Sequence, residues 1–265
     1  MFDEHAHVSV AEVVYYFPVF FLAIWLTIKH RSSGWCFLIL LSVLRIVGPA
    51  CLIASESSIG TKTDFTIAAI FSSVGLSPLI LSMLGLIHRA HRGITNSHGL
   101  PSLWFHLLHV TVLAALALAI VGGIKESHDS SSDVSTGHAL VKAAIVLFTV
   151  IFLVQAGIAL FTLARIQHVA ERRIIYAVCI SLPFLAVRLA FSLAGAFDTK
   201  SLTFNVLDGN VWAFAFMALF EEFIVVGLYL ALGFLLPSPR ELESQRVYGE
   251  DIDASDLQGS EYKGM

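Results

Sequence analysis

Two neighbouring glutamates, Glu221 and Glu222, stand in the run FMALFEEFIVV, in which every other residue is apolar. Two arginines, Arg45 in SVLRIV and Arg188 in LAVRLA, lie in apolar runs of the same kind. Carboxylates and guanidinium groups in such surroundings can pair with one another, bind a small charged molecule, or pass a proton. Which of these they do depends on the elements that position them.

Those elements are long apolar segments. The chain has 265 residues, of which 57% are hydrophobic and 14% are charged, whereas a soluble domain carries about 25% charged residues. The apolar residues form unbroken blocks of about 20, the length that a helix needs to cross about 30 Å of hydrocarbon. We therefore predict an all-α, polytopic membrane protein, a bundle of seven transmembrane helices. The blocks are residues 8–28, 35–54, 65–88, 102–124, 138–166, 174–196 and 211–236.

The lysines and arginines between the blocks predict the orientation of this bundle. Seven crossings place the two ends of the chain on opposite sides of the membrane. One side carries ten of the 16 lysines and arginines, the other carries four, and Arg45 and Arg188 lie within blocks. Because the more basic loops face the cytosol, we predict an external or lumenal N-terminus and a cytosolic C-terminus.

The composition divides the chain into one membrane domain, residues 1–236, and a tail, residues 237–265. The tail is acidic and poor in apolar residues. It therefore cannot bury enough apolar surface to fold, and we predict that it is disordered and cytosolic. A cytosolic partner could bind such a tail.

The helical rise places the buried charges near the middle of the membrane. At 1.5 Å per residue, Glu221 and Glu222 lie about 15 Å from the external end of their block, and Arg45 lies about 15 Å from the cytosolic end of its own. Arg188 lies about 21 Å from the cytosolic end of the sixth block. Each charge would cost about 2.5–3.5 kcal/mol if it faced lipid. We therefore expect these side chains to point into the bundle and to meet.

Two roles for these charges remain open. Adjacent residues on a helix point about 100° apart, so Glu221 and Glu222 cannot both face one arginine. One glutamate could pair with Arg45 and the other with Arg188, or one could be protonated. The group is then either an ion-pair lock that fixes the register of the helices, or a polar pocket that binds or moves a small molecule, an ion or a proton.

Other polar residues lie inside the blocks. Ser73 and Ser77 share a helix face, where they could line the same cavity, contact a neighbouring helix or hydrogen-bond to their own backbone. For Gln155 we expect a hydrogen bond between helices, or a place in the same interior. Glu12 and Lys142 lie close to the external edge, where we expect their side chains to reach water as rim residues.

The histidines gather on the cytosolic side, which holds seven of the eleven. His88 and His91, and likewise His106 and His109, have an i, i+3 spacing that could bind zinc. We favour a second explanation, a belt of amphipathic rings at the membrane interface next to the basic loops. We expect no metal, no cofactor and no nucleic-acid partner.

Two stretches resemble a known family: RSSGWCFLILLSVLRIVGPACLIAS, which starts at Arg31, and SSVGLSPLILSMLGLIHR in the third block. They are similar to fungal integral membrane proteins classified as domain of unknown function 7702. The resemblance covers the seven blocks and leaves the tail outside. It implies a fungal protein with seven spans, and it implies no activity. The residues that carry it are Ser32, Ser33, Gly34, Trp35, Arg45, Gly75, Leu76, Ser77 and Pro78.

Our leading hypothesis is a transporter-like or receptor-like membrane protein that binds or moves a small molecule at a site in the middle of the membrane, built from Arg45, Arg188, Glu221 and Glu222. One alternative is an integral-membrane enzyme of the terpene-cyclase type, in which a buried glutamate is the general acid. Enzymes are the less favoured class, because the chain lacks a phosphate loop, Gly-x-Ser-x-Gly and His-Glu-x-x-His. Another alternative is a seven-helix receptor that signals through its cytosolic face. The lipid bilayer of the plasma membrane or of an internal membrane is the expected partner in each case.

Overall fold

The computed structural model describes residues 4–30, 33–56, 71, 74–91, 102–126, 131–165, 169–197 and 219–237. All regular secondary structure in these residues is helical, as the sequence predicts. The helices are α1 (Glu4–His30), α2 (Ser33–Glu56), α4 (Leu76–His91), α5 (Ser102–Glu126), α6 (Ser131–Arg165), α7 (Val169–Phe197) and α9 (Glu221–Leu235).

Five of these helices, α1, α2, α5, α6 and α7, are long and apolar enough to cross a membrane. The described parts of α4 and α9 have 16 and 15 residues, which is shorter than the roughly 20 that a full crossing needs. The beginnings of the third and seventh apolar blocks lie outside the described residues, and so does the predicted tail from residue 238 onward. The chain is thus a helical membrane protein with five candidate spans in its described part.

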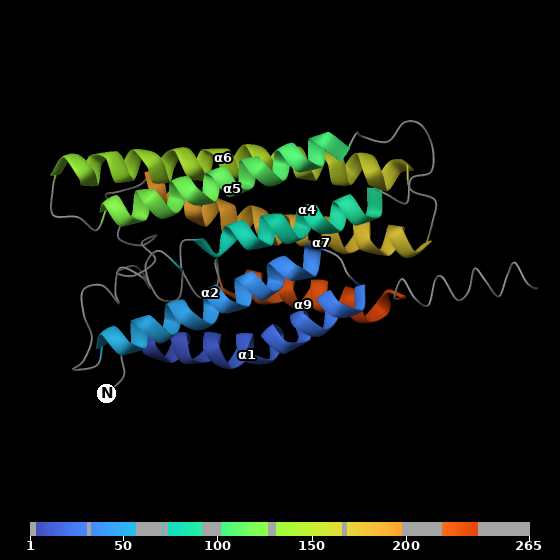
Figure 1. Ribbon diagram of the computed structural model, residues 1–265, viewed down its shortest axis with the longest axis horizontal. Helices are drawn as coiled ribbons and strands as arrows, with labels where there is room; N and C mark the ends of the chain where they lie inside the picture. The colour runs from blue at the N-terminus through green and yellow to red at the C-terminus, as the bar shows by residue number, and fades with distance from the viewer. Residues whose placement is uncertain are drawn as a thin grey trace, which may run out of the picture.

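The helices pack side by side along a common direction (Figure 1). The α5–α6 pair lies at one side of the bundle and α1 at the other, with α4 between them. The central helix α4 contacts α2, α5, α6 and α7, and every residue from Leu76 to Ile87 is buried. A helix that is covered on all sides in this way belongs to the core of the bundle. The outer helix α5, by contrast, exposes Leu103, Trp104, Leu107, Val110 and Leu113.

Glycines allow α5 and α6 to cross at close range. A Cβ atom on Gly122 would lie 2.8 Å from a methyl carbon of Val141, and one on Gly137 would lie 2.7 Å from the backbone nitrogen of Glu126. Only residues without side chains fit at such distances, so the backbones of the two helices touch near the loop that joins them. Small residues serve the same purpose in other membrane helix pairs.

The helix α9 is hydrogen-bonded to the end of α1 and to the start of α2. The indole nitrogen of Trp35 donates a hydrogen bond to the backbone oxygen of Tyr229 at 3.2 Å, and His30 Nε2 donates to the backbone oxygen of Gly233 at 2.7 Å. The His30 and Trp35 rings stack with centroids 4.7 Å apart. A Cβ atom on Gly233 would lie 2.8 Å from the indole nitrogen of Trp35. This contact therefore joins the two ends of the chain and positions α9 along its axis.

The close crossing of α5 and α6 predicts that two glycines of α6 respond differently to the same substitution. Gly137→Ala should lower the free energy of unfolding by about 1–3 kcal/mol, because the added methyl group meets backbone atoms that cannot move aside. A Cβ atom on Gly157 would have no neighbour within 4 Å, so Gly157→Ala should be neutral or stabilise the helix by up to about 1 kcal/mol. Thermal unfolding of the two purified variants in detergent checks this. Equal effects would contradict the crossing.

Candidate functional site

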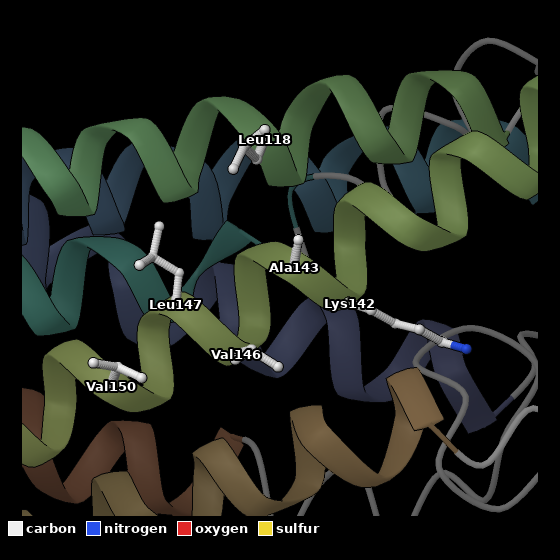
Figure 2. A pocket seen from close by; sticks show the side chains of 6 residues that line it. All are labelled: Leu118, Lys142, Ala143, Val146, Leu147 and Val150. Carbon is white, nitrogen blue, oxygen red and sulfur yellow. The ribbon is translucent and has the colours of Figure 1, made fainter.

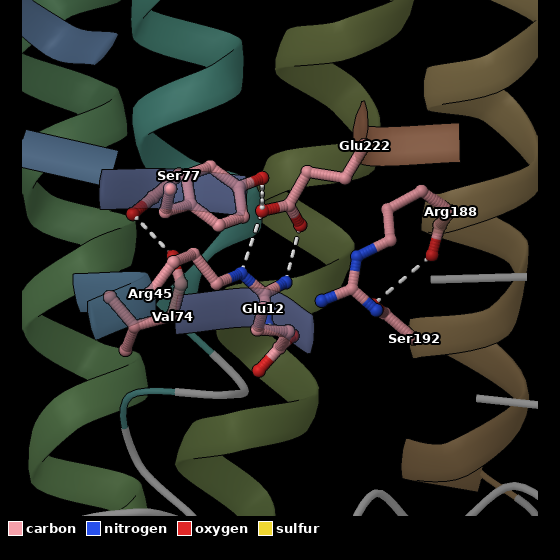
Figure 3. Close-up of polar contacts among 8 residues, drawn as sticks. Glu12, Arg45, Val74, Ser77, Arg188, Ser192 and Glu222 are labelled. Carbon is pink, nitrogen blue, oxygen red and sulfur yellow. Dashed lines mark hydrogen bonds and ion pairs between the residues drawn. The ribbon is translucent and has the colours of Figure 1, made fainter. Parts of the chain in front are cut away.

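A buried ion pair between Arg45 and Glu222 lies at the centre of the site. Arg45 Nε donates a hydrogen bond to Glu222 Oε1 at 2.6 Å, and Arg45 Nη2 donates to Glu222 Oε2. The two parallel hydrogen bonds form the fork-shaped pairing that guanidinium and carboxylate favour. Figure 3 shows this pair, which joins α2 and α9; the two residues are 177 positions apart in the chain. Of the two neighbouring glutamates, Glu222 is the one that meets Arg45.

Two residues of α1 complete the shell of this pair. Arg45 Nη1 donates to Glu12 Oε1 at 3.1 Å, and the Tyr16 hydroxyl donates to Glu222 Oε1 at 2.6 Å. Glu12 and Tyr16 are four residues apart, so they lie on one face of their helix. The exposed fractions of the four side chains are 3% or less. The pair is therefore closed off from its surroundings and joins α1, α2 and α9.

The prediction that Glu12 is a rim residue was wrong. Its side chain is buried and bonded to Arg45 rather than directed toward water. The physical reason is the reach of arginine: the guanidinium of Arg45 contacts Glu12 from the neighbouring helix and offers it a full positive charge. Lys142, the other predicted rim residue, is half-buried, and its ammonium lies 5.6 Å from the centre of the Phe197 ring.

Arg188 brings a second guanidinium into the same interior. Its side chain is 2% exposed, and Figure 3 shows it directed from α7 toward the Arg45–Glu222 pair. The charge of Arg188 interacts with those of Arg45, Glu222 and Glu12. The Ser192 hydroxyl donates to the backbone oxygen of Arg188 at 3.2 Å, one turn further along α7. The structure thus places the two predicted arginines next to each other, in spite of their equal charge.

Glu221 occupies a different face of α9 from Glu222. It is half-buried, and its charge interacts with that of Arg188. Its Oε2 atom is buried and accepts no hydrogen bond from the described residues. The two residues before it, 219–220, form a π-helical turn, a widened turn that is frequent at functional sites. Glu221 is therefore the less constrained carboxylate of the two.

The missing side chain of Gly75 leaves room for the guanidinium of Arg45 beside the start of α4. A Cβ atom at Gly75 would lie 3.0 Å from Arg45 Nη2, 3.1 Å from Nε and 3.2 Å from Cζ. The backbone just before α4 therefore packs directly on the plane of the guanidinium. Ser77 is buried, but its hydroxyl donates to the backbone oxygen of Val74 at 2.9 Å. Of the options predicted for Ser77, the structure shows the bond to its own backbone, and Ser73 lies outside the described residues.

Glu12, Arg45, Arg188, Glu221 and Glu222 together are called the charge cluster below. Three carboxylates stand against two guanidinium groups, so these five side chains carry one net negative charge when all are ionised. In a medium of low dielectric constant, a net charge is costly. The net negative charge of the charge cluster is therefore typical of a site that takes up a proton or another cation.

Sequence reasoning missed Glu12, Tyr16 and Gly75 as members of the site. Glu12 and Tyr16 could have been found from their spacing, because they continue a buried stripe of α1 that includes Val19, Ala23 and Leu26. No pattern in the sequence could have identified Gly75 as a neighbour of Arg45, because that contact requires the packing of α2 against α4.

Gln155 and the histidines do not belong to the charge cluster in the described structure. Gln155 is completely buried on α6, and neither atom of its amide group has a hydrogen-bond partner among the described residues. The described residues therefore do not supply the hydrogen bond between helices that we predicted for Gln155. His88 stacks on Phe105 with centroids 4.6 Å apart, and the described residues contain no group of three potential metal ligands.

Fold and site define a helical membrane protein with a buried charge cluster shared between the first and last parts of the chain. The sequence matches the family model of a domain of unknown function (DUF7702) over residues 2–239. The chain therefore belongs to this family. No match was found among curated proteins. Three residues that carry the family resemblance, Trp35, Arg45 and Gly75, make the contacts that position α9 and the charge cluster.

The geometry predicts that removing the charge of Glu222 and removing the charge of Glu221 change the free energy of unfolding by different amounts. Glu222→Gln breaks a buried ion pair and should lower the free energy of unfolding by about 3–5 kcal/mol. Glu221→Gln removes a carboxylate that is half-buried and has no direct ion pair in the described residues, so its effect should stay below about 1 kcal/mol. Thermal unfolding in detergent measures both. A larger loss for Glu221→Gln would show that the wrong glutamate has been assigned to Arg45.

Proposed function

We propose that the protein is a seven-span membrane protein that binds a small anionic molecule together with a proton at the charge cluster. One observation carries the proposal: five charged side chains from four helices gather in one interior. A lock between helices needs only one arginine and one carboxylate. Each further charge in the membrane lowers stability, and such charges are retained where they serve a function.

The contacts divide the charge cluster into two parts. Arg45, Glu222 and Glu12 are joined by direct ion pairs and have the geometry of a lock. Arg188 and Glu221 interact with each other through their charges, and Glu221 is half-buried rather than enclosed. We assign the binding of the anionic group to Arg188 and the binding of the proton to Glu221. The ion-pair lock and the binding site are then neighbours. The lock hypothesis applies to Arg45, Glu222 and Glu12, and the binding hypothesis applies to Arg188 and Glu221.

The charge balance supports joint binding of an anion and a proton. The five side chains of the charge cluster carry one negative charge when all are ionised. An anion that enters together with one proton leaves this net charge unchanged, whereas an anion alone would double it. Because each unit of buried charge is costly in a medium of low dielectric constant, the coupled event is the one that the site favours.

A cyclase has one observation in its favour. Aromatic rings lie close to Glu222: Tyr16 bonds to it, Tyr15 stacks on Phe223 with centroids 4.1 Å apart, and Tyr16 lies 5.7 Å from Phe223. Aromatic faces stabilise cations, and a carbocation formed by protonation from Glu221 would be such a cation. We place this alternative second, because Tyr15 and Phe223 stack on each other, which closes the two ring faces that meet to a cation.

Seven spans and the orientation can be tested by glycosylation. The chain has no Asn-x-Ser/Thr sequence of its own. An acceptor site inserted between residues 126 and 131 should be glycosylated in a eukaryotic host, because this loop is predicted to be external or lumenal. The same insertion between residues 92 and 101 should stay unmodified. Digestion with an endoglycosidase, followed by electrophoresis, detects the difference, and the opposite pattern would reverse the orientation.

Proton coupling can be tested in liposomes that contain the purified protein and a pH-sensitive dye. Gradients of inorganic phosphate, succinate or citrate are the probes. We expect at least one of these anions to acidify the lumen in a protein-dependent way. Glu221→Gln should reduce the acidification at least tenfold and leave folding intact, while Arg188→Lys should retain part of it because it keeps the charge.

Glu126→Gln is the matched control for this experiment. Glu126 is also a partly buried glutamate, but it is paired with His138 at the end of α5, outside the charge cluster. Acidification that is equal in wild type and Glu221→Gln, or absent with all three anions, would contradict the proposal. Formation of a cyclised product from an isoprenoid epoxide, abolished by Glu221→Gln, would favour the enzyme instead.

A further inference from the structure

A second feature of the molecule, independent of the charge cluster, is a groove of about 440 Å³ on the α5–α6 pair. It is lined by Leu118, Lys142, Ala143, Val146, Leu147 and Val150 (Figure 2). Five of the six residues are apolar. Val146 and Val150 are about half exposed, so the groove opens to the outside of the bundle.

The groove follows from the way in which α5 and α6 cross. The two backbones touch at Gly122 and Gly137, and the groove starts about one helical turn further from the joining loop, at Leu118 and Lys142. The residue Ala143 has the smallest side chain of the lining. From Lys142 to Val150 the groove follows α6 for about 12 Å, so it is an elongated, open apolar groove with a cation at one end.

Lys142 differs from the other charged residues near the α5–α6 loop. Lys125 pairs with Asp133 at 3.0 Å, and Glu126 pairs with His138 at 2.7 Å. Lys142 forms no ion pair with the described residues, and its ammonium rests on the Phe197 ring. Figure 2 shows its side chain extending away from the apolar residues of the groove. Its positive charge is therefore available to an anion outside the described chain.

The length of α6 places Lys142 close to the level of lipid headgroups. The helix has 35 residues, or about 52 Å, whereas the hydrocarbon core is about 30 Å thick. The predicted apolar block 138–166 starts seven residues, or about 10 Å, after the start of α6, so this end of the helix projects from the hydrocarbon. Lys142 lies about 16 Å from the start of α6, which is within snorkelling distance of the headgroups.

We infer that the groove is a specific site for an anionic phospholipid in the leaflet that contacts the α5–α6 loop. One acyl chain lies along Leu118, Val146, Leu147 and Val150, and the phosphate group faces Lys142. The apolar lining recognises the chain, and the single cation provides the preference for an anionic headgroup. A lysine near the membrane surface gives about a fivefold preference for anionic over zwitterionic lipid.

The experiment uses the full-length protein in detergent with phosphatidylglycerol or phosphatidylcholine of identical acyl chains, and native mass spectrometry counts the bound lipids. The wild type should retain phosphatidylglycerol about fivefold more than phosphatidylcholine. Lys142→Gln should remove this preference and keep binding of both lipids. Val146→Trp fills the groove and should reduce both lipids at least fivefold.

Lys29→Gln is the matched control, since Lys29 also lies over an aromatic ring, at 5.2 Å from the centre of Trp25, but does not line the groove. It should retain the full preference. Soluble glycerol phosphate in excess should not displace the lipid, because it lacks the chain; displacement would show that the site binds the phosphate group alone. Equal retention of the two lipids by the wild type, or an unchanged preference in Lys142→Gln, would overturn the inference. Thermal unfolding of each variant confirms that it is folded, and the outcome does not depend on proton coupling at the charge cluster.

Discussion

The bidentate ion pair between Arg45 and Glu222 is the interaction on which the rest of the structure depends. The buried guanidinium of Arg45 is paired with carboxylates from other helices, because α2 itself offers none nearby. Glu222 from α9 and Glu12 from α1 supply these carboxylates. The first and last parts of the chain are therefore joined by a charge that neither could bury alone, at the cost of desolvating every member.

Several packing details follow from this pair. Gly75 is needed because the guanidinium lies where a side chain would otherwise be. The hydrogen bonds from Trp35 and His30 to α9 fix the same helix about 10–16 Å further along its axis. With two points of attachment, α9 can neither slide nor rotate freely against α1 and α2. Because Glu222 is bonded to Arg45, the neighbouring Glu221 must point in a different direction. Its charge then interacts with that of Arg188.

Much of this arrangement could be predicted from the sequence. The length of the apolar blocks predicts the helices because the thickness of a bilayer and the rise of a helix are constant. Depth along each helix predicts that Arg45 and a glutamate of the last block meet, because a charge at that depth must find a partner. Glu12 was misplaced because depth alone favoured water as its neighbour, and only the direction of the Arg45 side chain shows otherwise. For Ser77, a bond to its own backbone was the favoured option, because it satisfies the hydroxyl without a neighbouring helix, and the structure shows that bond.

The sequence by itself determined that the chain is helical, belongs in a membrane and carries charges that must be shielded from lipid. These properties depend on composition and on distance along one helix, which a sequence states directly. The tertiary structure alone decided that Glu222 rather than Glu221 binds Arg45, that Glu12 and Tyr16 complete the pair, and that Gly75 packs on the guanidinium. These contacts depend on the rotation of each helix about its axis and on which helices are neighbours, and both result from the simultaneous packing of all helices.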